Sequence, residues 1–497
     1  MTNSPPGFRT RGAMSRRDML KLGAALGVSA SVLQACGSNG DPAELGSEDL
    51  KGKSVDMTVL GIAGWPPSAL AAGLGNQGFA TQAKSDGGYT ASFKLTEAPF
   101  AQLFQKAATS LATRSQEYNI MISDSQWLGA FAQPKWILPL NDVIEKYPSL
   151  DIEWYSDIVS TGYMYYPEGS SNVYGLPQEG DVQVMFVRKD LLENPKEKAA
   201  YKAKHGKDLP QTFEDFEKLS WTDYESVLEF FTRPQQDLYG TSLQYSKEYD
   251  FFTCFFYPFL FSNGGDIWDA ESRNVQGILN TDENAAQLEA FVRMQRYQAP
   301  GSNQVGIAEQ ADLFTEGRLF SCLQWAAMGP AMIPEEMKND VLVVPPPAFD
   351  VGGELKRIYT LGGQPWVLNA FNDAAHQQVA IDYMEYWYQP ETQLEFARQG
   401  GNPCDARTLN SEGFDGIQPW FRAYKYMLKD GRTRDFWHDP NYANMLSNQQ
   451  EAFTAYATGQ VQDPKVALDY AAYKQQEILF DAGQTTTKPS GSAPSLA

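Results

Sequence analysis

Short apolar runs alternate with longer helical stretches through most of the chain, and this alternation constrains the fold more than any other feature. The run SVDMTVLGI from Ser54 places apolar residues at every second position, as a half-buried strand does. NIMISD from Asn119 and VQVMFVRKDLL from Val182 indicate two further strands, the second apolar enough to be buried on both faces. TDENAAQLEAFVRMQRY from Thr281 has a capping residue, an acidic first turn and one apolar helical face. Strands that alternate with helices predict an α/β fold with a mainly parallel sheet.

The first 35 residues have the pattern of an export signal. SRRDMLK from Ser15 carries a twin arginine, residues 22–33 are uncharged, small and apolar, and LQAC ends at Cys36. This resembles a twin-arginine signal with a lipobox, which implies cleavage before Cys36 and acylation of that cysteine. The alternative is a membrane-anchor helix, but the apolar run is shorter than the ~20 residues that span a bilayer. We predict an export signal over 1–35 and a lipidated tether over 36–53.

The net charge of the chain and the absence of several catalytic motifs exclude some classes of function. The chain has 40 Lys and Arg against 61 Asp and Glu, a formal net charge of −21, which argues against nucleic acid and anionic ligands. Its three histidines lie far apart in the sequence, and no nucleophile-elbow, zinc-protease or phosphate-loop motif occurs. Paired carboxylates such as Glu179 and Asp181 leave a glycosidase as an alternative, although a solvated loop explains them better. We therefore predict a protein that is not an enzyme.

Besides Cys36, the chain contains Cys254, Cys322 and Cys404. Export permits a disulfide, so a Cys254–Cys322 bridge and three buried thiols are both open. No cysteine or histidine spacing is typical of zinc, and we expect neither a metal nor a cofactor.

Aromatic residues make up 13% of the chain, and several tryptophans lie in loops rich in Gly, Asn, Asp and Gln. Sugar rings have apolar C–H faces that stack on indoles, and hydroxyls that need carboxylate and amide partners. Core packing is the alternative for any single tryptophan. The tryptophans in such loops are Trp65, Trp127, Trp268, Trp325 and Trp366.

One polar cluster follows directly after a predicted strand. In ISDSQWLGAF, the apolar run ends in Asp124, Ser125, Gln126 and Trp127. The polar side chains suit hydroxyls, and the indole suits a ring face. Trp127 also opens a helix-like stretch near Phe131, so its side chain alternatively points into the core.

Segments along nearly the whole mature chain carry a family resemblance. In chain order they are ISDSQWLGAFAQPKWILPLND, VYGLPQEGDVQVMFVRKDLL, LPQTFEDFEKL, LYGTSLQY, FLFSNGGDIWD, FTEGRLFSCLQWAAMGP, VLVVPPPAF, LGGQPWVLN and ATGQVQDPKVALDYAA. Together they resemble the maltose-binding-protein-like (family 1) solute-binding proteins of bacterial carbohydrate ABC importers. The resemblance implies a type II periplasmic-binding-protein-like fold, with two α/β lobes joined by crossing strands around a ligand cleft. The bounds we expect are 54–183 and 362–420 for lobe 1, 184–361 and 421–482 for lobe 2, and 483–497 for a disordered tail.

The resemblance also implies which residues face the ligand, because ligands of such sheets lie outside the carboxyl ends of strands. The family has Gly-Gly-Trp where this chain has GGQPW, so Gln364 is an alternative to Trp366 as the contact there. The implied ligand-binding residues are Trp65, Asp124, Ser125, Gln126, Trp127, Gln178, Glu179, Asp181, Gly363, Gln364, Trp366 and Arg407, faced from the second lobe by Asn263, Asp266, Trp268 and Trp325.

The implied function is capture of a mono- to oligosaccharide or a polyol by a monomeric lipoprotein on the outer face of the cell membrane. Lobe closure would deliver the ligand to the ABC permease subunits. A binding protein for a cationic solute such as a polyamine, a secreted glycosidase, and a sensor or adhesin stay open as alternatives.

Overall fold

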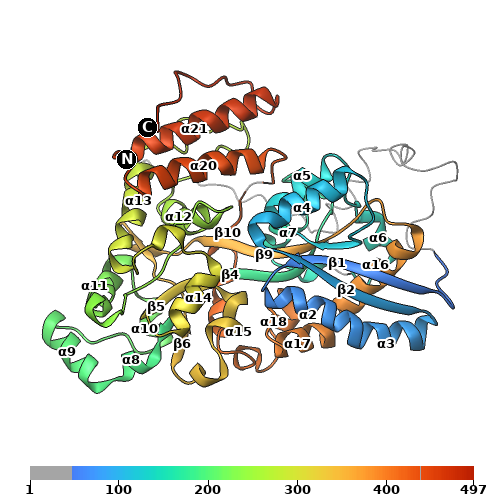
Figure 1. The fold of residues 1–497 in the computed structure, drawn as a ribbon, viewed down its shortest axis with the longest axis horizontal. Helices are drawn as coiled ribbons and strands as arrows, with labels where there is room; N and C mark the ends of the chain where they lie inside the picture. Colours follow the sequence, from blue (N-terminus) through green and yellow to red (C-terminus); the bar gives the residue numbers. More distant parts are fainter. Residues whose placement is uncertain (1–47, 151, 437, 497) are drawn as a thin grey trace, which may run out of the picture.

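An eight-stranded mixed sheet runs through the computed structural model, which describes residues 48–496 apart from 151 and 437 (Figure 1). The strand order is β2-β1-β3-β9-β4-β5, with β10 paired to β9 and β6 paired to β4. Only β1 with β2, β1 with β3, and β9 with β10 are parallel pairs, so the expectation of a mainly parallel sheet is wrong. The strands are β1 (Ser54–Ile62), β2 (Thr90–Ala98), β3 (Ile120–Ile122), β4 (Leu176–Arg188), β5 (Ser321–Trp325), β6 (Val341–Val344), β9 (Tyr359–Leu368) and β10 (Thr433–Arg434).

The first lobe forms around the parallel strands β1, β2 and β3. Figure 1 shows helices on both sides of these strands, and these helices come from two segments that lie far apart in the sequence. The helices of this lobe are α2 (Pro66–Leu74), α3 (Ala80–Gln82), α4 (Phe100–Ala112), α5 (Leu128–Ala132), α6 (Asn141–Lys146), α7 (Asp157–Tyr163), α16 (Ala374–Trp387), α17 (Pro390–Arg398) and α18 (Ala406–Leu409).

Two long antiparallel strands, β4 and β9, join the lobes through the middle of the molecule (Figure 1). The end of β9 pairs with β3 in the first lobe, while the last residues of β4 pair with β5 and β6. β4 is buried along almost its whole length, as its apolar sequence predicts. The implied crossing strands are therefore present.

The second lobe is helical around β5 and β6. α12 (Phe251–Ser262), with the sequence FFTCFFYPFLFS, is buried at every residue and forms its centre. The predicted helix from Thr281 is present as α13 (Asp282–Arg293), and the Thr281 side chain accepts a hydrogen bond from Asn284 N. The other elements are α8 (Lys189–Glu193), α9 (Pro195–His205), α10 (Phe213–Glu217), α11 (Trp221–Phe231), α14 (Ile307–Thr315), α15 (Gly329–Met332), β7 (Phe349–Val351) and β8 (Glu354–Lys356).

The C-terminal part of the chain packs on the second lobe. α19 (Phe421–Met427) lies against β4 and β6, and α20 (Tyr442–Ala457) and α21 (Pro464–Asp481) pack together on α12 and α13 (Figure 1). The stretch predicted as a disordered tail makes contacts in the structure: the side chain of Gln476 donates to Thr487 O at 2.9 Å, and Leu496 is buried.

Several predictions are not tested by these elements. The export signal and the lipidated Cys36 lie outside the described residues, and the lobe boundaries stay predictions. None of the described helices has the length and apolar character needed to cross a membrane. Cys254, Cys322 and Cys404 are free buried thiols, so the Cys254–Cys322 bridge is not formed.

Candidate ligand-binding cleft

One cavity lies where the two lobes and the crossing strands meet. Its volume is about 40 Å³, whereas a cavity that holds a single water needs roughly 10–15 Å³. The lobes therefore stand close together, with space for a few waters between them. The first lobe contributes Ile62, Trp65, Phe100, Asp124 and Gln126, the second contributes Gln244, Asp250, Phe251, Cys254, Ile307 and Trp325, and the crossing strands contribute Asp181, Leu361, Gly362, Gly363 and Gln364.

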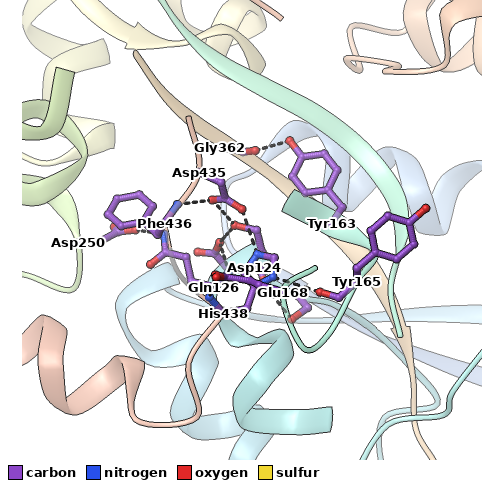
Figure 2. Close-up of polar contacts among 12 residues, drawn as sticks. Asp124, Gln126, Tyr163, Tyr165, Glu168, Asp250, Gly362, Asp435, Phe436 and His438 are labelled. Atoms are coloured by element: carbon purple, nitrogen blue, oxygen red, sulfur yellow. Dashed lines mark hydrogen bonds and ion pairs between the residues drawn. The ribbon is translucent and has the colours of Figure 1, made fainter. Parts of the chain in front are cut away.

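The polar cluster after β3 forms one wall of this cavity. Asp124 caps the single 3₁₀ turn over Ser125–Trp127, where its carboxylate accepts hydrogen bonds from Gln126 N at 3.4 Å and from Ser125 Oγ at 3.2 Å. Gln126 reaches across to the second lobe, where its Nε2 donates to Asp250 Oδ2 at 3.0 Å (Figure 2). The turn thus places Asp124 and Gln126 on the cavity and connects the lobes at the same point.

Trp127 does not line the cavity. Its side chain is only 1% exposed and packs against Phe104 and Phe131, with ring centroids 5.5 and 6.1 Å away. Its indole N–H donates to the hydroxyl of Tyr249 from the second lobe. The side chain points into the lobe because the helical turn carries it away from Asp124. Trp127 is thus a packing and interlobe residue in the structure.

The crossing strand β4 brings Asp181 to the cavity. Its Oδ1 accepts from Val182 N at 2.8 Å and from Ala327 N at 3.1 Å. No donor among the described residues reaches its Oδ2, although that atom is buried. Burial raises the pKa of Asp181 to about 8, against the pull of these backbone N–H groups. Asp181 therefore presents one carboxyl oxygen without a partner to the cavity.

Glu179 and Gln178 lie behind the cavity. Glu179 accepts from the indole N–H of Trp65, which also donates to Gln364 Oε1 at 3.1 Å. Burial, and then the charge of Asp181, raise the pKa of Glu179 well above its usual range. Gln178 is buried, with its Nε2 at 3.5 Å from Pro67 O. Glu179 and Gln364 thus hold the Trp65 ring in place.

Two indoles form the aromatic walls. Trp65 comes from the first lobe and Trp325 from the end of β5, and both are almost fully buried at 6% and 7% exposure. The ring of Trp325 lies against Gly362, where a Cβ would come within 2.6 Å of it. Gly363 has φ +86° and a Cβ there would lie 2.4 Å from the Tyr163 hydroxyl, so this position requires glycine.

Three predicted contacts from the second lobe lie at the far end of α12. The cavity touches the start of α12, and its 12 residues span about 18 Å. Asn263 ends this helix and donates to Phe259 O, Asp266 pairs with Arg434 at 2.8 Å, and the Trp268 ring lies 4.3 Å from the Arg273 guanidinium. Asn263, Asp266 and Trp268 are therefore not at the cavity.

Three more predicted residues lie outside the cavity lining. Trp366 is packed inside the first lobe, with the ring of Trp387 at 5.3 Å. Arg407 is paired with Asp405 at 2.6 Å. Ser125 donates to Asp435 Oδ1 at 3.0 Å, away from the cavity.

A buried acid–histidine pair supports the 124–127 turn from behind (Figure 2). Asp435 follows β10 and contacts His438 Nε2 at 3.1 Å, while His438 N donates to Glu168 at 2.9 Å. Burial alone would lower the pKa of His438, but the hydrogen bond and charge of Asp435 raise it overall. His438 thus offsets the negative charge of Asp435, whose carboxylate also faces Ser125.

The cavity itself is acidic. Asp124 and Asp250 come from opposite lobes, and burial together with the charges of Asp250 and Asp435 raises the pKa of Asp124. Burial raises the pKa of Asp250 to about 6. Among the described residues that line the cavity, none is Lys, Arg or His. In the described part of the chain, no group of three His, Cys, Asp or Glu side chains is placed to hold a metal ion.

Sequence reasoning missed several lining residues. Asp250 and Phe251 stand at the junction between a polar loop and an apolar helix, as Asp124 stands after an apolar strand, and that repeated junction was the available signal. Gln244 lies in a segment that carries the family resemblance, but no local pattern marks it. The remaining missed residues are Ile62, Phe100, Cys254, Ile307, Leu361 and Gly362.

Comparisons with known proteins agree with this architecture. The family model described as bacterial extracellular solute-binding protein matches residues 87–394. The structure of maltose-bound MalE3 of T. maritima has a TM-score of 0.69 at 18% identity, covering 86% of this chain and 100% of that chain. A solute-binding protein of Agrobacterium radiobacter K84 in complex with ribitol also gives 0.69 at 18% identity, covering 87% and 100%. One from Agrobacterium vitis S4 with bound D-mannitol gives 0.66 at 16% identity, covering 87% and 99%. The predicted two-lobed α/β fold is confirmed.

Proposed function

The chain belongs to the bacterial extracellular solute-binding proteins, and we propose that it is the substrate-binding lipoprotein of an ABC importer for a sugar or a polyol. It captures the ligand between its lobes and presents it to the permease subunits. No bond is made or broken in this role. The proposal takes the ligand class from proteins of the same fold, which are described as bound to maltose, ribitol and D-mannitol.

One observation carries this proposal: a single cavity is walled by two indoles and by acceptor side chains from both lobes and the crossing strands. Trp65 and Trp325 offer flat apolar faces for the C–H side of a sugar ring. Asp124, Asp181 and Asp250 offer oxygens for its hydroxyls. Such a site selects by hydroxyl pattern, because each buried partner left unmet costs about 1–3 kcal/mol.

The contacts between the lobes support transport by closure. Gln126 with Asp250, and Trp127 with Tyr249, join the lobes beside the cavity. A ligand that touches both walls adds contacts that exist only when the lobes are together, so it shifts the population toward the closed form. The permease then distinguishes liganded from free protein by that form.

Export and anchoring complete the proposal. The twin arginine and the lipobox at Cys36 support a lipoprotein held on the outer face of the cell membrane. Palmitate labelling of cells that express the full chain, with a Cys36→Ser control, tests this part. Label on the variant would contradict it.

A ligand panel tests the binding function. Sugars and polyols are titrated into the purified protein, and tryptophan fluorescence and the melting temperature are recorded. A ligand at 100 times its Kd adds about 2.7 kcal/mol to the free energy of unfolding, and Trp65 and Trp325 place two indoles on the cavity to report it. If no sugar or polyol binds, the proposal is wrong. Steady release of product from a chromogenic glycoside would instead support the glycosidase alternative.

A second candidate is a cationic solute such as a polyamine. The acidic lining of the cavity favours it, because aromatic walls with carboxylates also suit amines. The same panel includes putrescine and spermidine, and binding of these alone would decide for this candidate.

A further inference from the structure

The carboxylates of the cavity face each other without a cation. Asp124 from the first lobe and Asp250 from the second both contact Gln126, through its N–H and its Nε2. Asp181 lies on the same cavity. The basic side chain drawn behind the turn, His438, pairs with Asp435 and does not line the cavity (Figure 2). Closing the lobes thus brings like charges together with few waters between them, which costs free energy unless a proton or another positive charge enters.

Several buried side-chain oxygens of the cavity lining have no hydrogen-bond donor among the described residues. A carboxylate accepts only, so Gln126 must turn its amide nitrogen to Asp250, and its Oε1 is left without a donor among the described residues. Gln244 likewise uses its Nε2 on Gln310 at 2.7 Å, and its buried Oε1 has no donor within the described chain. With Asp181 Oδ2, open oxygens come from the first lobe, the second lobe and the crossing strand. The matching ligand supplies several N–H or O–H donors.

These observations distinguish between ligand classes. A neutral sugar supplies donors but no charge, and would leave the carboxylates unpaired. A metal ion is disfavoured, since no three ligating side chains among the described residues form a suitable group. A simple alkylamine supplies charge but few donors for the remaining oxygens. An ammonium group, with three donors and no acceptor, on a polyhydroxylated skeleton meets both requirements.

We propose that the ligand is an amino-substituted sugar or polyol, with its ammonium group near Asp124 and Asp250 and its hydroxyls on the remaining acceptors. This inference rests on the proposed binding function. The ammonium group offsets the repulsion between carboxylates of opposite lobes, so the charge of the ligand drives closure. The raised pKa values of these carboxyls add a consequence: binding of the cation releases protons.

Matched probes test the charge. D-glucosamine is compared with D-glucose and N-acetyl-D-glucosamine, and 1-amino-1-deoxy-D-sorbitol with D-sorbitol, by isothermal titration calorimetry at pH 6.5. Putrescine is the amine without a sugar. We expect the amine of each set to bind at least about tenfold tighter than its neutral partners. Its heat should differ between two buffers of unlike ionisation enthalpy, because protons are released.

A variant locates the charge. Asp250→Asn should weaken binding of the amino probe by roughly 30-fold or more and weaken its neutral partner by a clearly smaller factor, so that the preference for the amine falls at least about tenfold. Asp312→Asn, on the exposed face of α14, should change neither. Circular dichroism confirms that each variant is folded, and the comparison of charged with neutral probes on the unaltered protein does not depend on the variants.

The outcomes separate the two proposals. Equal or tighter binding of the neutral or N-acetyl partners overturns the ammonium site but leaves sugar binding in place. Putrescine binding more tightly than both amino probes overturns the polyhydroxylated part in favour of a simple amine. If no sugar, polyol or amine binds, both proposals fail.

Discussion

Replacing Asp181 with Asn should make the protein more stable and a poorer binder. Asp181 is buried, its Oδ1 holds the backbone N–H groups of Val182 and Ala327, and its Oδ2 has no donor within the described residues. Asn keeps the first oxygen and removes the charge. The substitution therefore removes a carboxylate that, in the proposed function, accepts from the ligand. The same carboxylate lowers the stability of the free protein because its charge is buried.

The size and sign of the effect follow from the pKa of Asp181. The carboxyl has an ordinary value of 3.8 and, because of burial, a value of about 8 in the folded protein. Between these values the folded state holds the proton that the unfolded chain has lost, so the free energy of unfolding falls as pH rises, by at most about 1.4 kcal/mol per pH unit. Between pH 5 and pH 8, Asp181→Asn should gain about 2–4 kcal/mol relative to the unaltered protein.

Other consequences of the substitution do not obscure this change. The new amide N–H group lacks an acceptor and has a fixed cost of about 1–3 kcal/mol, which cancels when two pH values are compared. Glu179 loses a neighbouring charge that raises its pKa, so its own burden at high pH also falls. Both effects leave the sign of the pH-dependent difference unchanged.

Urea unfolding at pH 5 and pH 8, followed by tryptophan fluorescence and by circular dichroism, measures this difference. The two signals must give the same midpoint for a two-state analysis. Asp312→Asn, an exposed carboxyl on α14, should shift the free energy of unfolding by less than about 0.5 kcal/mol at either pH. A stability difference for Asp181→Asn that is the same at both pH values, or that shrinks at pH 8, would refute the reasoning.

Three further substitutions separate the roles of neighbouring aromatic residues. Trp65→Ala should weaken the binding of any sugar probe at least about tenfold in calorimetry, while Trp154→Ala, whose ring is 42% exposed, serves as the control and should leave binding unchanged. Trp127→Ala should lower the free energy of unfolding by about 3–5 kcal/mol in urea; a fully stable variant with weak binding would instead place this indole on the ligand. Tyr249→Phe leaves the buried Trp127 N–H without its interlobe acceptor, which costs the closed form about 1–3 kcal/mol; small-angle scattering should show a larger radius of gyration, and an unchanged radius would remove Tyr249 from the closing contacts.

The strands and helices of this chain were predictable because their apolar spacing is local. The buried run from Val182 and the capped helix from Thr281 are present as predicted. The direction of strand pairing was not predictable, since β4 pairs with β9, whose residues are more than 170 positions away in the sequence. Alternation along a strand does not encode its partner.

Position along an element explains why some predicted contacts miss the cavity. Gln364 and Trp366 lie on the same face of β9, yet Gln364 lines the cavity and Trp366 pairs between β3 and β4 inside the first lobe. Two residues of strand move a side chain about 7 Å. The two side chains share a face of the strand, and the distance from the lobe junction decides which of them meets the cavity.

The 124–127 turn joins the cavity wall to a contact between the lobes. Asp124 and Gln126 face the cavity, while Trp127, the next residue, contacts Tyr249 of the other lobe. Tyr249 has φ +45°, a left-handed conformation that is costly for a bulky residue and that its neighbours must hold in place; Gln450 on α20 donates to its carbonyl. Asp250, the next residue, binds Gln126. Two short segments, one from each lobe, thus each carry a cavity-facing acid and a nearby aromatic ring that contacts the other lobe. A ligand that neutralises the acids stabilises the same backbone that brings the rings together, and no longer pathway is needed to couple binding to closure.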